Sequence, residues 1–115
     1  MIFTAHLLAF DYDAKTREID VPDSIIDQQI GSLDQPLRPG KLVALLEQIF
    51  FYGQNDFQPR PIRSLSVGDV VRLHDGRLYR VLGLGWERIP EHLEVEDLAR
   101  GMQATLARPT YERVV

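Results

Sequence analysis

An Asp-Gly pair between two apolar segments is the feature that most constrains how this chain of 115 residues folds. The pair is Asp75-Gly76, and it separates residues 67–73 from residues 78–86, which are both rich in β-branched, aromatic and long aliphatic side chains. Such side chains favour strands, and Asp-Gly between two strands favours a two-residue type I′ turn, whose central residues both have positive φ. The sequence therefore predicts an antiparallel β-hairpin here.

The predicted turn also sets which residues pair across the hairpin and which face the core. It places Arg72 opposite Tyr79. Side chains alternate between the two faces of a strand, so one face of the second segment is expected to fill the core. That predicted core face consists of Leu78, Leu82, Leu84 and Trp86. The opposite face carries Tyr79 and Val81 and then two glycines, which indicate a bulge, a bend or the floor of a groove for a partner.

The remaining segments predict an α+β fold. Residues 2–12 are apolar on both faces, which is typical of a central strand. An apolar stripe at three- and four-residue spacing lies between Gly40 and Gly53, and we expect this helix to lie on the sheet. The other expected elements are a strand at 17–21, a short helix from 22 to Gly31, a loop at 54–63, a closing helix at 93–107, and a tail that is either frayed or a short added strand. The β-β-α-β-β-α order describes a small antiparallel β-sheet with helices packed on one face.

Length and composition fit a single domain over residues 1–115. Apolar residues make up 44% of the chain and charged residues 26%, which is ordinary for a soluble globular protein. The chain has no cysteine, which excludes disulfides and thiolate metal sites and suits a reducing cytoplasm. The first residues lack the basic start and the cleavage site of a signal peptide, and no apolar run reaches the length of a bilayer span. We therefore expect a cytoplasmic protein.

Positive charge is concentrated in the hairpin region of an otherwise acidic chain. The net charge is −4, but residues 60–88 carry six arginines against three acidic side chains. Arginines beside aromatic side chains are typical of surfaces that contact phosphates and bases. The same arginines also occur at solvated strand edges, and the same aromatic residues fill the cores of small sheets. The candidate binding residues are Arg72, Arg77, Tyr79, Arg80, Gly83 and Gly85.

No pattern in the sequence predicts a catalytic, metal or cofactor site. The histidines His6, His74 and His92 fall in three different predicted elements, without the spacing of metal ligands. Ser64 and Ser66 precede a strand, whereas a hydrolase nucleophile sits on a sharp strand-to-helix turn. The glycines of the hairpin are not followed by a helix, as a dinucleotide-binding loop requires. We therefore expect no enzyme activity, no metal ion and no cofactor.

Asp69 and His6 are polar residues of the predicted strands, and we expect both to have structural roles. Gly68-Asp69 predicts a tight turn before the hairpin, with the Asp69 carboxylate accepting hydrogen bonds from nearby backbone N–H groups. His6 is expected at the edge of the core, hydrogen-bonded to the backbone.

The middle of the chain, residues 45–89, resembles the YodL-like and related small domains that occur alone or inside large proteins of bacterial mobile elements and phages. In those domains a helix that ends near an aromatic residue and Asn is followed by a Ser-Leu-Ser-Val-x-Asp-Val-Val strand, a hairpin, and a closing strand with Gly and an aromatic residue. The matching residues here are Phe51, Asn55, Ser64, Leu65, Ser66, Val67, Asp69, Val70, Val71, Gly85 and Trp86. The resemblance implies a bacterial domain associated with mobile elements. It assigns no catalytic residues, since the biochemical function of the family is itself unknown.

These features together predict a small binding module rather than an enzyme. We favour a protein partner, or a second copy of the chain in a homodimer, over a nucleic acid. The alternative is an RNA- or DNA-binding module that uses the Arg-rich hairpin.

Overall fold

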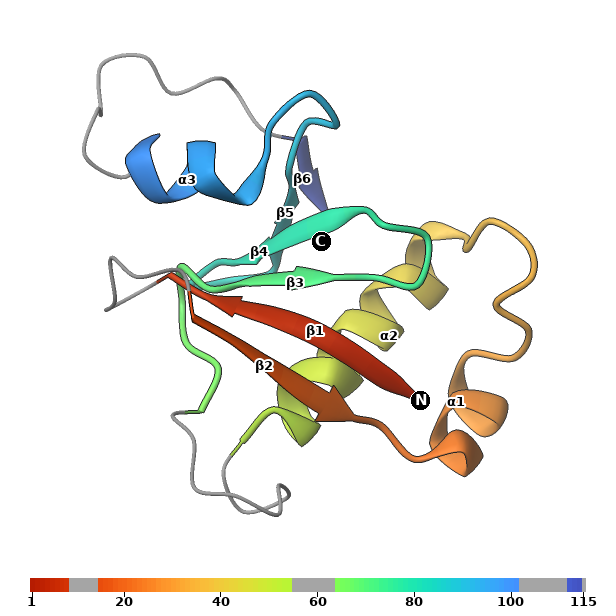
Figure 1. Cartoon of the computed structure of the whole chain (residues 1–115). Coiled ribbons are helices and arrows are strands. Elements are labelled where there is room, and N and C mark those ends of the chain that lie inside the picture. Colours follow the sequence, from red (N-terminus) through yellow and green to blue (C-terminus); the bar gives the residue numbers. More distant parts are fainter. Residues whose placement is uncertain (9–14, 55–63, 102–111, 115) are drawn as a thin grey trace.

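Within the residues that this computed structural model describes (1–8, 15–54, 64–101 and 112–114), six strands form one antiparallel sheet and three helices accompany it. The elements are β1 (Ile2–Leu7), β2 (Lys15–Asp20), α1 (Asp23–Gln29), α2 (Pro39–Tyr52), β3 (Val70–Arg72), β4 (Leu78–Val81), β5 (Trp86–Arg88), α3 (Val95–Gly101) and β6 (Glu112–Val114). The strand order is β2-β1-β3-β4-β5-β6 (Figure 1). This arrangement confirms the predicted α+β class and the antiparallel sheet.

β1 is a central strand, as the apolar character of both its faces predicts. It pairs with β2 on one side and with β3 on the other. Phe3, Ala5 and Leu7 belong to the core cluster that α2 covers, whereas Leu8, directly after the strand, belongs to a second cluster. His6 is buried and alternates with Ala5 and Leu7, so it lies on the face opposite α2.

α1 begins and ends where the sequence predicts, and α2 ends at the predicted Gly53 but begins at Pro39, before the predicted start. Pro22 is the N-cap of α1, and Gly31, with a φ of 90°, follows its last turn. Gly53 is the C-cap of α2, and its N–H donates to the Ile49 carbonyl at 2.8 Å. α2 packs its apolar stripe against the sheet, and the fully buried residues of that stripe are Leu45, Leu46 and Ile49.

The β3–β4 hairpin has a three-residue loop in place of the predicted two-residue loop. The Leu73 N–H donates to the Arg77 carbonyl at 2.9 Å, and the Gly76 N–H donates to the Leu73 carbonyl at 3.0 Å. Gly76 has a φ of 89°. This pattern is that of a turn followed by a glycine bulge, which is the common form of a three-residue hairpin loop.

The additional loop residue shifts the pairing of the hairpin by one position. Tyr79 lies opposite Val71 rather than Arg72, and Arg80 lies opposite Val70. A shift of one residue exchanges the faces of a strand. Tyr79 therefore points into the core beneath α2, while Arg72 and Arg80 share the opposite face. The predicted register is wrong by one residue.

The second apolar segment of the predicted hairpin is two strands joined by a turn. In this turn the Leu82 N–H donates to the Gly85 carbonyl at 3.1 Å. The side chain of Leu84 is 78% exposed and Leu82 is only partly buried, so the prediction that both fill the core is wrong. Leu78 and Trp86 are buried as predicted, but they belong to the two different core clusters. The glycines of this segment therefore mark a bend.

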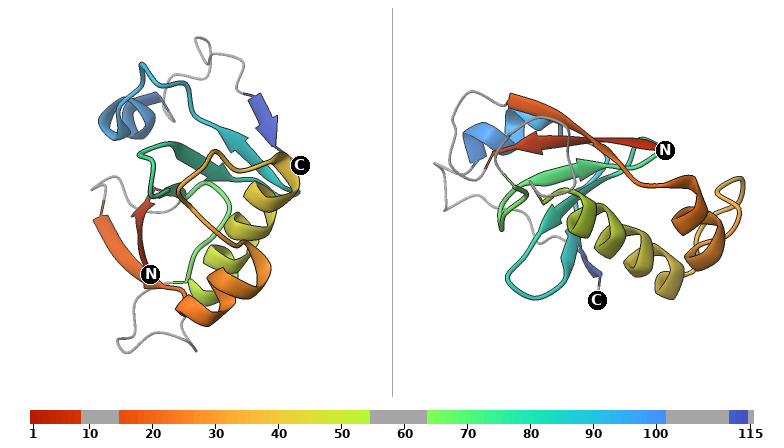
Figure 2. Two further views of the ribbon diagram at one scale, coloured as in Figure 1. Left: turned by 90° about the vertical axis from the view of Figure 1, so that its right-hand side faces the viewer. Right: turned by 90° about the horizontal axis from the view of Figure 1, so that it is seen from below.

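α3 packs on the face of the sheet opposite α2, which differs from the expectation that the helices share one face. Val95 and Leu98 of α3 form the second core cluster together with Val70, Leu78 and Ile89. Both faces of β4 are buried, so the sheet needs cover on both sides at this point. The views in Figure 2 show α2 and α3 separated by the sheet.

Asp69 closes the turn that precedes β3, as predicted. Its side chain is fully buried, and its Oδ2 accepts a hydrogen bond from the Ser66 N–H at 2.9 Å. Its own N–H donates to the Ser66 carbonyl at 3.0 Å, and Gly68 between them has a φ of 99°.

Parts of three predicted elements lie outside the described residues. These parts are residues 9–12 of the first strand, residues 55–63 of the loop, and residues 102–107 of the closing helix. β6 pairs with β5 and so confirms the added strand, one of the two alternatives for the tail.

Candidate binding groove at the β3–β4 hairpin

A groove of about 670 Å³ lies around the β3–β4 hairpin. Three segments that are distant in the sequence line it: residues 33–37 between α1 and α2, the hairpin residues 72–79, and residues 89–94 between β5 and α3. Leu42 of α2 completes the lining. The volume is within the range of about 300–1,000 Å³ that is typical of small-molecule pockets in proteins.

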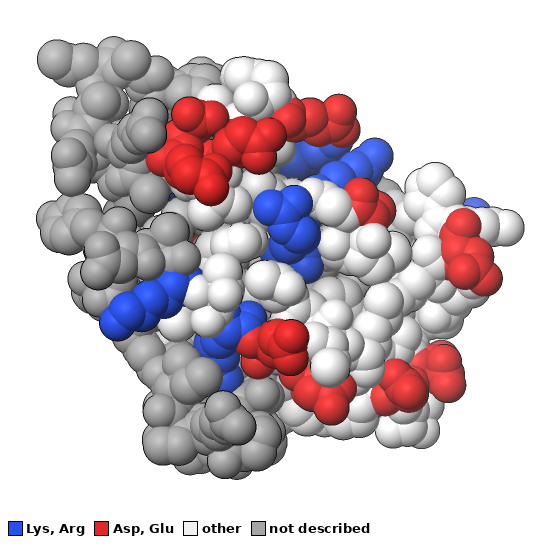
Figure 3. All heavy atoms as spheres, viewed as in Figure 1, with Lys and Arg blue, Asp and Glu red and all other residues white. Residues whose placement is uncertain are grey.

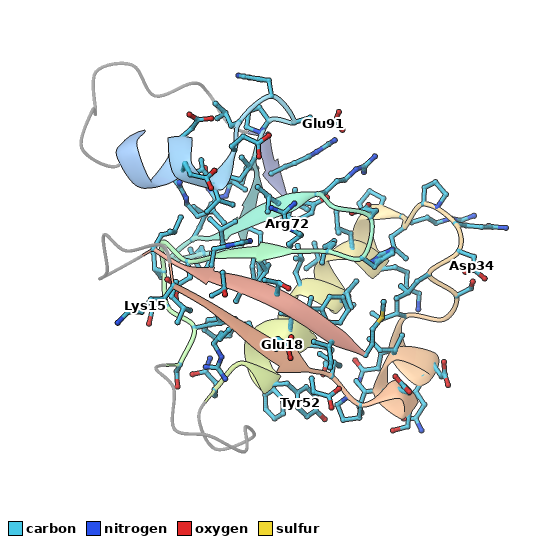
Figure 4. The ribbon with its side chains drawn as sticks, in the orientation of Figure 1. Lys15, Glu18, Asp34, Tyr52, Arg72 and Glu91 are labelled. Carbon is cyan, nitrogen blue, oxygen red and sulfur yellow. The ribbon has the colours of Figure 1, made fainter. Side chains whose placement is uncertain are left out.

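Figure 4 shows the position of three lining residues. Asp34 lies on the segment between α1 and α2, Glu91 lies on the segment before α3, and Arg72 lies on β3. The hairpin loop lies between Asp34 and Glu91 in this view. The walls of the groove therefore come from loops, and its base comes from the sheet.

The base of the groove is apolar and belongs to the core. Its buried residues are Leu73, Leu78, Tyr79 and Ile89. Leu33, Leu37, Leu42 and Leu93 are partly buried and line the sides. Because packed core side chains hold these positions, the groove is formed before any partner arrives.

Tyr79 contributes a polar atom to this apolar base. Its side chain is 1% exposed, and its hydroxyl forms no hydrogen bond among the described residues. A tyrosine hydroxyl can both donate and accept a hydrogen bond. The Tyr79 hydroxyl is therefore suited to a polar group of a bound molecule.

Charges of both signs surround the apolar base. The charged lining residues are Asp34, Asp75, Glu91 and Glu94, which are acidic, and Arg72 and Arg77, which are basic. Acidic side chains also gather over α3 on the face shown in Figure 3, where the basic side chains lie in separate small groups. The groove therefore lies in a predominantly acidic setting.

The structure describes four arginine side chains between residues 64 and 101. Each of them contacts an oxygen atom of the chain. Arg72 Nη1 donates to the Gly76 carbonyl at 3.2 Å, and Arg77 Nε lies 3.6 Å from Asp75 Oδ2. The other two contacts are Arg80 Nη1 to Glu87 Oε1 at 3.5 Å and Arg88 Nη2 to Glu91 Oε1 at 2.9 Å. Three of these four arginines thus face a carboxylate, whereas Arg72 bonds to a neutral carbonyl and keeps its net charge.

The structure brings three of the six predicted binding residues together in the groove. Arg72, Arg77 and Tyr79 line it. Arg80 is only 7% exposed and lies against Glu87 on the face of α3. Gly83 and Gly85 are exposed in the turn between β4 and β5, away from the groove lining.

Comparison with known proteins supplied no relative. No family model, curated protein or solved structure matches the chain. The resemblance of residues 45–89 to YodL-like domains therefore stays a prediction. Separately, no helix among the described residues is long and apolar enough to cross a membrane.

Sequence reasoning missed most of the groove walls. Residues 33–37 were predicted only as a connecting loop, and Pro90 only as a break after the hairpin. Residues 93–94 were predicted as the start of the closing helix, which begins at Val95 in the structure. Both segments combine proline with leucine and acidic residues, and their periodicity gives no sign of a shared site. Leu42 was predicted as part of the α2 stripe, and the structure confirms that it packs at the margin of the core.

A second group of polar side chains is buried on the α3 face but lies outside the groove lining. His6 is 9% exposed, and its Nε2 has no hydrogen-bond partner among the described residues, so the expected backbone bond is not formed there. Burial lowers the pKa of His6 from its ordinary value of 6.5; the charge of Arg72 lowers it further and that of Glu96 raises it. No group of three potential metal ligands forms within the described ranges.

Proposed function

We propose that the chain is a non-catalytic binding module whose groove receives a segment of a protein partner. The observation that carries this proposal is the groove of about 670 Å³ at the β3–β4 hairpin. It combines a base of buried apolar side chains with a rim that carries charges of both signs. An apolar centre with a polar rim is typical of protein–protein interfaces.

The state of the arginines supports a protein partner over a nucleic acid. Affinity for nucleic acids depends on Lys and Arg side chains that neutralise phosphates. Arg72, Arg77 and Arg80 contact oxygen atoms within the chain, and four carboxylates line the same groove. The Tyr79 ring is buried, so it does not offer a face on which a base can stack.

Selection from a random peptide library displayed on phage, with the full chain immobilised, tests this proposal. Peptides that bind the groove should lose affinity for Gln35→Trp, because Gln35 is exposed in the groove lining and a large side chain there occupies the site. Gln28→Trp is the matched control, since Gln28 is equally exposed but lies on α1 outside the groove.

The result that overturns the proposal is a failure to obtain any peptide that distinguishes Gln35→Trp from Gln28→Trp. A single-stranded oligonucleotide of random sequence tests the alternative function. Tight binding that weakens with salt, and that Arg77→Glu abolishes, would favour the nucleic-acid module instead. Light scattering over a range of concentrations reports whether a second copy of the chain is itself a partner.

A further inference from the structure

We infer that the protein segment bound in the groove is apolar at its centre and carries Lys or Arg on both sides. This inference rests on the proposed function, and it specifies the chemistry of the partner. It follows from the charges on the two loop walls, from the leucines between them, and from the tyrosine hydroxyl at the base.

Four carboxylates line the groove, and arginine side chains pair with only two of them. Asp75 is paired with Arg77, and Glu91 is paired with Arg88. Asp34 and Glu94 form no ion pair among the described residues, and the bonds between Glu94 and Asp97 use the backbone of Glu94, not its carboxylate. Two acidic side chains of the groove are therefore open to a basic partner.

The two open carboxylates stand on different walls. Asp34 belongs to the segment between α1 and α2, and Glu94 belongs to the segment that leads into α3. A chain segment that follows the groove around the end of the hairpin would pass from one carboxylate to the other. Leu73 lies along this path on the α2 side of the sheet, and Leu78 lies along it on the α3 side. Complementary charges at such positions raise the association rate and select against acidic competitors.

Tyr79 provides the polar contact at the base. Its hydroxyl forms no hydrogen bond among the described residues, so it can donate to a backbone carbonyl or accept from an N–H of the bound segment. A peptide backbone offers both groups at every residue except proline. The hydroxyl thus favours a polypeptide over a purely apolar ligand.

The library selection described above also tests this inference, with two charge-reversal variants added. Asp34→Lys combined with Glu94→Lys should weaken the selected peptides by about tenfold, which corresponds to the loss of two ion pairs and the gain of repulsion. Asp27→Lys combined with Glu47→Lys changes the net charge equally at exposed helical positions outside the groove, so it should leave the affinity unchanged.

The outcomes separate the inference from the proposed function. Enrichment of Lys and Arg beside apolar residues, together with loss of binding in the groove reversal alone, supports the inference. Peptides that depend on Gln35 but show no basic enrichment, or that bind both reversal variants equally, overturn the inference and leave the proposed function standing. If no selected peptide depends on Gln35, the proposed function itself fails.

Discussion

Tyr79 lies directly opposite Val71 in the β3–β4 hairpin, and this pairing puts its ring beneath α2 and at the base of the groove. The predicted two-residue loop would place Tyr79 opposite Arg72, on the same face as the arginine. The three-residue loop separates the two side chains onto opposite faces. One residue of loop length therefore removes the aromatic–arginine surface and supplies the base of the groove.

Replacement of Gly76 by alanine should destabilise the protein by about 1–2 kcal/mol, because an L residue is strained at positive φ. Gly76 has a φ of 89°, and no atom lies within 4 Å of an added Cβ, so strain alone is tested. Gly83→Ala is the control, since its Cβ also meets nothing and its φ is not in the left-handed range. Urea denaturation measures both changes. Equal stability of the two variants would contradict the assigned loop geometry.

Gly53→Ala should destabilise the protein by about 1–3 kcal/mol through overpacking. A Cβ at Gly53 would lie 2.7 Å from Leu65 Cδ1 and 3.0 Å from the Ile49 carbonyl oxygen. Gly40→Ala serves as the comparison, because its Cβ meets no atom within 4 Å and alanine favours the helix. Thermal unfolding of both variants checks the prediction, which fails if Gly53→Ala is as stable as Gly40→Ala.

The stability of the protein should fall as the pH drops through the titration range of His6. Burial is the main cause that lowers the pKa of His6 below 6.5, so the folded chain favours the neutral ring. The unfolded chain therefore binds more protons as the pH falls below about 6.5, and protonation draws the equilibrium toward unfolding. Urea titrations at pH of about 7.5 and about 5.5 measure the free energy of unfolding at each pH. We expect this free energy to fall less for His6→Gln than for the natural chain when the pH is lowered. Identical losses would show that His6 does not contribute.

The buried Arg80–Glu87 pair should be far more sensitive to loss of one partner than the exposed Arg88–Glu91 pair. The side chains of Arg80 and Glu87 are 9% and 12% exposed, whereas that of Glu91 is 76% exposed. Glu87→Gln should cost about 3 kcal/mol, because it removes the negative charge that faces a buried guanidinium. Glu91→Gln should cost less than about 1 kcal/mol. Chemical denaturation of the two variants tests this order, and a reversed order would refute it.

Local signals in the sequence predicted the helices of the first half of the chain. Pro22 and Gly31 bound α1, and Gly53 ends α2, because proline and glycine act on the backbone at their own positions. The tight turn at Asp69 was predictable for the same reason, since its carboxylate bonds to a backbone N–H only three residues away. Features that depend on residues a few positions apart in the sequence could therefore be derived from the sequence alone.

The register of the hairpin and the walls of the groove could not be derived in this way. Asp75-Gly76 suits a two-residue loop and also a three-residue loop with a glycine bulge, so local chemistry does not choose between them. Burial on both faces of β4 decides the position of α3, and this depends on strands that are distant in the sequence. The segments 33–37 and 89–94 meet only through the packing of the whole domain.

Amide chemical shifts measured by NMR during titration with a peptide selected on the full chain test the central claim most directly. We expect the largest shift changes on residues 33–37, 72–79 and 89–94, which line the groove, and we expect Gln35→Trp to remove them. Shift changes centred on the β4–β5 turn at Leu84, or on the edge strand β2, would contradict this prediction.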